Sequence, residues 1–277
     1  VVLSAWWFYR SGGIAGLGRW GRVLAGCALV VGAVVVRNYA VGGEWLLTTS
    51  SAGMNFYVGN HSGANGIYAQ VDFLSSAEPD LERAAFIREA EMRTGRTLSP
   101  GAASQFWLQS GLRFAWDNPR AYSRLLGRKL YMFWNGVEAQ NNLSIYLAQD
   151  FVPLLRWFFL GWGMLAPWAL VQWTLTPRQE RIAILDLYFL AYLAGCLLFF
   201  VSSEYRLPVV PVLILYAARG LIDFAAKAAS GEYRPLLSTV LLVCLVGLPI
   251  NYRDAGAERL TRKRVDYYNF GTLYQRR

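Results

Sequence analysis

Long apolar stretches separated by short polar segments dominate the second half of the chain, and one more lies near its start. About 20 apolar residues cross the hydrocarbon core of a bilayer as a helix. The pattern therefore predicts five transmembrane helices. They are expected at residues 17–36, 151–173, 182–201, 207–225 and 235–250.

The short loops between these stretches carry basic residues mainly on one side of the predicted membrane. Short cytoplasmic loops are enriched in lysine and arginine, so the side that holds Arg206 alone is predicted to be extracytoplasmic. This places residues 37–150 and the turn at 202–206 outside. The basic residues of the opposite, cytoplasmic side are Arg10, Arg19, Arg22, Arg178, Arg181, Lys227 and Arg234.

The long outside segment has helix signals of its own. Ser99 before Pro100, and Asn118 before Pro119, each place a capping residue ahead of a proline at the first helical position. The sequence thus predicts an all-α polytopic membrane protein with a mostly helical extracytoplasmic subdomain. The expected domains are 1–36 (the end of a preceding span, a cytoplasmic loop and the first complete transmembrane helix), 37–150 (the subdomain), 151–250 (four transmembrane helices) and 251–277 (an extracytoplasmic tail).

Two parts of this subdomain are predicted to be non-helical. Residues 44–49 have the composition of a short strand. The Gly, Asn and Ser residues of 50–66 indicate irregular structure with tight turns. A long irregular segment in a helical protein is often functional.

Residues 118–134 form a basic amphipathic pattern. Two interpretations stay open: a helix lying along the membrane surface, or a helix packed on the subdomain with a solvated basic face. The apolar positions are Leu125, Leu126, Leu130, Phe133 and Trp134, and the basic ones are Arg120, Arg124, Arg128 and Lys129.

Composition supports lipid as the solvent, because 55% of the 277 residues are hydrophobic and only 16% are charged. The net charge of +9 comes without any nucleic-acid-binding pattern, so anionic membrane lipids are the expected partner. Cys27, Cys196 and Cys244 lie far apart in apolar segments. We expect no disulfide, no metal site and no cofactor.

Both ends of the chain carry signals of a larger protein. The opening run from Val1 to Tyr9 has the composition of the last turns of a membrane span and does not start with Met, which indicates a fragment. Residues 266–274 show the Asn-aromatic-Gly-x-x-Tyr pattern of a first tetratricopeptide-repeat helix.

No complete catalytic constellation is visible, but the turn at 202–211 suits an anionic ligand. Pro208 and Pro211 fit only near a helix start, so a positive helix end faces outward beside Arg206. Arg206 is then either a phosphate ligand or an interface arginine that reaches water or pairs with Glu204.

A second polar motif follows the first predicted span. Arg37-Asn38-Tyr39 precedes a segment from Gly53 to His61 that is rich in Gly, Asn and Tyr. Glycine lets a backbone approach a ligand closely, and Asn and Tyr side chains can bond sugar hydroxyls. The alternative is a loop whose Asn side chains bond its own backbone.

These motifs, with a helix ending near Trp134 and Glu138 and the later Tyr-Arg-Leu-Pro-x-x-Pro run at 205–211, resemble bacterial members of glycosyltransferase family 39. This is the dolichyl-phosphate-mannose-protein mannosyltransferase superfamily, of the GT-C fold. The resemblance spans nearly the whole chain. It implies a GT-C-like bundle and transfer of a sugar from a polyprenyl-phosphate donor to a hydroxyl of a protein or glycolipid, on the extracytoplasmic face of a bacterial inner membrane.

The resemblance also implies that the catalytic acidic residue lies upstream of Val1, so that the chain is inactive alone. It leaves binding roles for the residues present. The donor phosphate is expected at Arg206 and Arg37, and the sugar or acceptor at Asn55, Tyr57, Asn60, Glu138, Glu204 and Tyr205.

Two other classes of protein stay open. One is a non-catalytic polytopic assembly or transport protein, although Asp186, Arg219 and Asp223 lie near span ends rather than at mid-span. The other is a glycan ligase or polymerase, which would share the membrane body and the outside arginines.

Overall fold

The computed structural model describes residues 2–47, 49–68, 71–74, 79–139, 145–157 and 161–252. These residues contain helices and no β-strand beyond one isolated bridge between Ile67 and Val201, which confirms the all-α class. The chain divides into two compact units, each described by itself below. The first comprises Val1–His61 and Gln70–Asp117, and the second Ser62–Ala69 and Asn118–Arg277.

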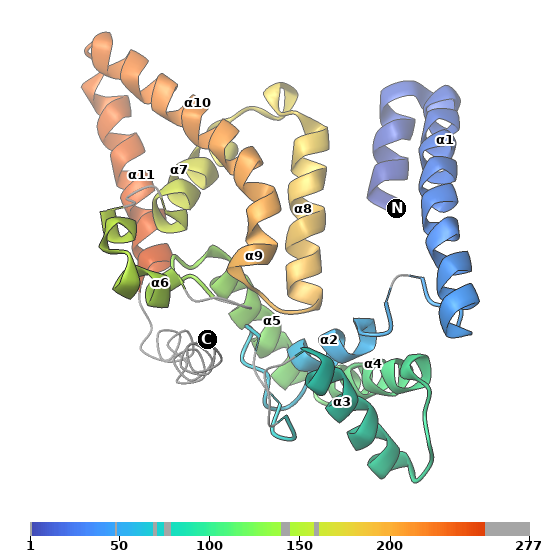
Figure 1. Ribbon diagram of the computed structural model, residues 1–277. Coiled ribbons are helices and arrows are strands. Elements are labelled where there is room, and N and C mark those ends of the chain that lie inside the picture. The colour runs from blue at the N-terminus through green and yellow to red at the C-terminus, as the bar shows by residue number, and fades with distance from the viewer. Residues whose placement is uncertain are drawn as a thin grey trace. The chain divides into compact units, whose positions relative to one another are not determined.

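The first unit begins with helix α1 (Val2–Gly42), which reverses direction at Gly12 and Gly13 (Figure 1). Gly13 has a φ of 55°, a conformation that favours glycine. The stretch Gly12–Gly42 is long and apolar enough to cross a membrane, and none of its most apolar window is buried inside the protein. The predicted first span is therefore confirmed.

Three further helices complete this unit: α2 (Ala52–Gly59), α3 (Pro79–Thr94) and α4 (Pro100–Asp117). They pack around Trp107, which is fully buried and donates from Nε1 to the Phe86 carbonyl over 3.0 Å. The predicted start at Pro100 is confirmed, and the Ala102 amide donates to Ser99 Oγ over 3.3 Å.

Two expectations for the first unit are wrong. The described residues of 44–49 form no strand, and Glu44 instead accepts a hydrogen bond from the Gly101 amide. The segment expected to be irregular, 50–66, contains α2 and is irregular with turns only on either side of it, at 50–51 and 60–66. Gly53 of α2 allows close packing on α4, because a side chain at this position would overlap the Ser104 carbonyl oxygen. Tertiary packing here overrides the low helix propensity of Gly and Asn.

The second unit is a bundle in which α7 packs against both α10 and α11, and α5 packs against α8 (Figure 1). Its elements in chain order are α5 (Pro119–Trp134), α6 (Ile145–Phe151), η1 (Pro153–Trp157), α7 (Trp162–Leu175), η2 (Arg178–Glu180), α8 (Ala183–Leu198), α9 (Ser203–Arg206), η3 (Leu207–Val209), α10 (Val210–Ala229) and α11 (Tyr233–Asn251).

Two stretches of this unit, Ser203–Ala229 and Tyr233–Asn251, are long and apolar enough to span a membrane, which confirms the predicted fourth and fifth spans. The predicted second span is not one helix. Pro153 and Gly161 interrupt its apolar run, and α7 has only 14 residues, about 21 Å at 1.5 Å per residue. The predicted third span is the 16-residue α8, an apolar helix shorter than expected.

Helix α5 starts at Pro119 as predicted, although Asn118 makes no side-chain cap. Arg120, Arg124 and Arg128 are exposed, whereas Lys129, which the pattern placed with them, is fully buried. Helix α5 packs on α8, which belongs to the expected membrane region rather than to the subdomain, so this contact supports neither interpretation as it was stated. The predicted repeat helix at 266–274 lies outside the described residues.

Candidate functional site: a buried arginine beside an open cavity

Two segments of the second unit come together where α5 ends and α9 begins. The Ser203 amide donates to the Ala139 carbonyl over 2.6 Å. Buried Ser202 caps α9, because its Oγ accepts from the Tyr205 amide over 3.2 Å. Helical structure therefore begins at Ser203, ahead of the prolines. Arg206 sits inside the first helical turns, with its side chain directed into the protein.

The Arg206 guanidinium is 1% exposed and hydrogen-bonds the chain that leaves α5. Nη1 donates to the Phe133 and Asn135 carbonyls over 3.1 and 2.7 Å. Nη2 donates to the Val137 carbonyl over 3.1 Å and to Glu138 Oε2 over 3.0 Å. These carbonyls have no helical partner beyond the end of α5, so Arg206 supplies the hydrogen bonds that the buried backbone needs.

A tryptophan covers the guanidinium. The Cζ of Arg206 lies 4.5 Å from the centre of the Trp162 ring, which is a cation–π contact. Trp162 is itself buried and donates to the Trp134 carbonyl over 3.1 Å. The arginine expected at the headgroup level is thus enclosed by protein. Its hydrogen bonds reach backbone carbonyls, Glu138 and the Ser203 hydroxyl, which gives Arg206 a structural role that the sequence pattern did not reveal.

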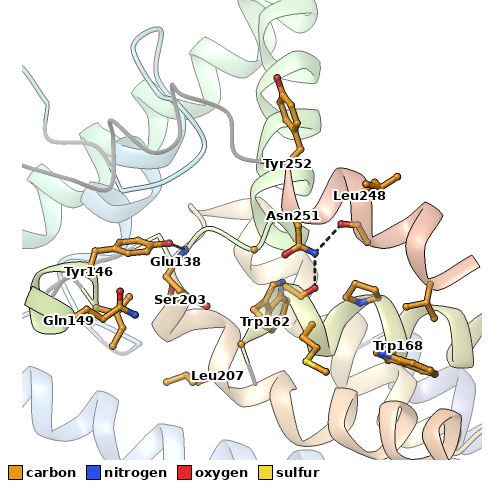
Figure 2. Close-up of a pocket in the computed structure, with 18 of the residues that line it drawn as sticks. Glu138, Tyr146, Gln149, Trp162, Trp168, Ser203, Leu207, Leu248, Asn251 and Tyr252 are labelled. Atoms are coloured by element: carbon orange, nitrogen blue, oxygen red, sulfur yellow. Dashed lines mark hydrogen bonds between the residues drawn. The ribbon is translucent and has the colours of Figure 1, made fainter. Parts of the chain in front are cut away.

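Beside this cluster lies an open cavity of about 1410 Å³, formed within the second unit. At one end Figure 2 shows Glu138, Tyr146, Gln149 and Ser203. Glu204 also lines the cavity. The other lining residues are mainly apolar or small: Gly136, Ile145, Leu155, Gly161, Trp162, Gly163, Met164, Pro167, Trp168, Leu207, Val243, Cys244, Gly247, Leu248, Asn251 and Tyr252.

The wall of the cavity is fixed where α11 ends against α7. Asn251 Nδ2 donates to the Gly163 carbonyl over 2.8 Å and to the Gly247 carbonyl over 2.9 Å (Figure 2). A side chain at Gly163 would overlap the Asn251 amide oxygen. The Gly136 amide donates to the Ile250 carbonyl over 2.7 Å, so the α5 exit and the α11 end form one junction.

The polar end is acidic. Glu138 is held through Oε2 by Arg206, and its backbone amide donates to the Tyr146 hydroxyl oxygen over 3.0 Å. Its side chain is 32% exposed. Glu204 is exposed. Among the described residues that line the cavity, none is Lys or Arg. This end can therefore accept hydrogen bonds from hydroxyl or amino groups, whereas its charge disfavours an anion.

A second buried cation lies near the other end of the α5–α8 contact. Lys129 Nζ donates to the Leu197 carbonyl in the last turn of α8 over 3.0 Å, where a positive charge complements the helix dipole. Burial lowers the pKa of Lys129 to about 8.

The predicted site residues of the first unit take other roles. Arg37 is exposed and Asn55 is half-buried. Tyr57 stacks on His61 and lies against Trp107, with ring centres 5.2 and 4.5 Å apart. Asn60 follows α2, is fully buried and donates from its side chain to the Phe56 carbonyl, so it closes the end of that helix. Burial lowers the pKa of His61.

In the second unit the structure pairs Arg206 with Glu138, and Glu204 lines the same cavity as Glu138. Tyr205 packs on Phe200 with ring centres 5.4 Å apart and does not line the cavity. Sequence reasoning missed Trp162 and Asn251. Their signal was present as a Gly-Trp-Gly run at 161–163 and as a polar residue at the end of a span.

Comparisons with known proteins add no relative: no family model, no curated protein and no solved structure matches this chain.

Proposed function

We propose that this chain is part of a membrane glycosyltransferase that takes a sugar from a polyprenyl-phosphate carrier and passes it to a hydroxyl acceptor. The observation that carries the proposal is the cavity. One end offers carboxylates, an amide and a phenol, and the remainder is lined by apolar residues of α7 and α11. A substrate with a hydroxyl-rich head and a long hydrocarbon tail matches both parts.

The apolar part supports a lipid tail specifically. Pro167 and Trp168 of α7 and Val243 and Leu248 of α11 line it, and α11 is long and apolar enough to span a membrane. Burying a hydrocarbon chain against such residues contributes roughly 25 cal/mol per Å² of apolar surface. A cavity of about 1410 Å³ exceeds the roughly 300–1,000 Å³ of sites for drug-sized ligands. The acceptor is a protein or glycolipid hydroxyl.

Binding to the carrier tests the proposal. The purified chain in detergent should bind undecaprenyl phosphate carrying mannose or glucose, measured by native mass spectrometry. Cys244→Trp places an indole in the apolar part of the cavity and should weaken this binding about tenfold or more. Leu237→Trp is the matched control, because Leu237 lies on the same helix, is 67% exposed and does not line the cavity.

Two results would overturn this function. One is failure of the wild-type chain to bind either sugar-bearing carrier. The other is wild-type affinity in a folded Cys244→Trp protein, which would separate binding from the cavity.

The proposed orientation places the polar end of the cavity outside the cytoplasm, because the short loops with most of the Lys and Arg belong inside. In a variant with Cys27 and Cys244 changed to Ser, a new cysteine at Ser62 should react with an impermeant maleimide in cells with a permeabilised outer membrane. A new cysteine at Gln179 should stay protected until the cells are lysed. Both positions are exposed. The reverse pattern of labelling would invert the topology.

A further inference from the structure

The polar end of the cavity holds one carboxylate in a fixed position. Glu138 Oε2 lies 3.0 Å from Arg206 Nη2, and the guanidinium is itself held by the carbonyls of Phe133, Asn135 and Val137. The backbone of Glu138 is held separately by Tyr146. Arg206 is enclosed, whereas Glu138 is partly exposed and lines the cavity. The arginine therefore acts on the cavity through the residues it holds there: Glu138, with its charge-assisted hydrogen bond, and Ser203, whose Oγ accepts from Nη2 over 3.3 Å.

Among the described residues, one oxygen of this carboxylate, Glu138 Oε1, has no hydrogen-bond donor beside it. An ionised carboxylate only accepts hydrogen bonds, and hydrogen bonds to a charged acceptor are about twice as strong as neutral ones. Groups that donate from two neighbouring positions, such as the hydroxyls of a sugar ring, suit such an acceptor.

The charge at this end argues against a phosphate beside Glu138. Glu204 adds a second carboxylate, and the described lining residues contribute no Lys or Arg. A phosphate here would face like charges without a cation in contact. Resting on the function proposed above, we infer that Glu138 binds the hydroxyl groups of the transferred sugar and that Arg206 is the residue that positions it.

The test compares two ligands on each protein: undecaprenyl phosphate carrying the sugar, and bare undecaprenyl phosphate. Glu138→Gln keeps the side-chain length and an oxygen for Arg206 but loses the charge. It should reduce the preference for the sugar-bearing carrier about tenfold, the loss expected for a hydrogen bond to a charged group. Affinity for the bare carrier should stay within twofold or rise, because a negative charge is removed.

Glu232→Gln is the matched control, because Glu232 is an exposed glutamate at the turn between α10 and α11 and does not line the cavity. It should keep the wild-type preference. A folded Glu138→Gln protein with the wild-type preference would overturn the inference while leaving the proposed function standing. A wild-type chain that binds both carriers equally would also overturn only the inference, whereas a wild-type chain that fails to bind the sugar-bearing carrier would overturn both.

The positioning role of Arg206 has its own readout. Glu138→Asp keeps the charge but shortens the side chain by one methylene, which draws the carboxylate away from Arg206 Nη2. The preference for the sugar-bearing carrier should fall, while the thermal midpoint changes little because Arg206 keeps its three backbone carbonyls. An unchanged preference in Glu138→Asp would show that the arginine does not position the sugar-binding group.

Discussion

The three packed helices α2, α3 and α4 of the first unit and the bundle α5–α11 of the second bury their polar groups differently. In the first unit, fully buried Asn60 bonds a carbonyl four residues away in α2, and fully buried Trp107 bonds the Phe86 carbonyl 21 residues away. In the second, Arg206 bonds carbonyls 69 to 73 residues away, and Lys129 bonds one 68 residues away. A hydrogen bond to a nearby carbonyl in the chain stabilises a single helix. A hydrogen bond to a carbonyl far away in the chain fixes how two elements pack.

The two regions also differ in how closely their helices pack. Helices α2 and α4 approach until glycine is the only residue that fits, at Gly53 and Gly111. Helices α7 and α11 also meet closely at one glycine, Gly163, but the packing around that contact leaves the large cavity open. The first region resembles an ordinary protein interior. In the second, buried Arg206 holds Glu138 of the cavity, whereas buried Lys129 bonds the last turn of α8 away from it.

Removing the Arg206 side chain should lower stability more than any other change proposed here. A small loss of stability would contradict the contrast between the two regions. Arg206→Ala leaves three carbonyls and Glu138 without a donor inside the protein. We expect a loss of about 3–5 kcal/mol in unfolding free energy, the range for breaking a buried ion pair. Thermal unfolding in detergent, followed by circular dichroism, measures it.

Arg219→Ala is the matched control for that experiment. Arg219 pairs with Glu180 and Asp223, but its side chain is 43% exposed, so water replaces the lost partners. We expect a much smaller shift in the unfolding midpoint. Equal shifts in the two variants would mean that Arg206 is no more structural than a surface arginine.

The close packing of the first region can be tested by adding one methyl group. At Gly53 the new Cβ would overlap the Ser104 carbonyl, so Gly53→Ala should destabilise by about 1–3 kcal/mol through overpacking. Gly127→Ala serves as control, because Gly127 is exposed in α5 and no atom lies within 4 Å of its Cβ position. There we expect a gain of about 0.5–1 kcal/mol from helix propensity. A stabilising Gly53→Ala would contradict the packing.

The sequence predicted what local patterns determine. Apolar runs located α1, α10 and α11, and the prolines at 100 and 119 marked helix starts. It did not predict the burial of Lys129, because lysine is almost always exposed unless paired. Nor did it show the partners of Arg206, which come from a segment some 70 residues away. Such contacts depend on the packing of helices, and a single sequence carries no local signal of it.

The smallest predicted effect concerns Lys129 and pH. Its pKa falls from an ordinary 10.5 to about 8 in the folded chain, so between these values the unfolded chain binds more protons than the folded one. The contribution of Lys129 to stability therefore rises as pH increases from about 8 to 10.5. In Lys129→Met this rise should be absent, whereas other titrating groups remain. The difference in unfolding midpoint between wild type and Lys129→Met, measured at several pH values from 7.5 to 10.5, isolates the contribution of the lysine.

At the lower end of this pH range, Lys129→Met should cost little stability or even increase it, because the variant buries no charge. A constant difference across that range would show that the lysine is buried without any change in its proton affinity, and the contrast between the two regions would then rest on Arg206 alone.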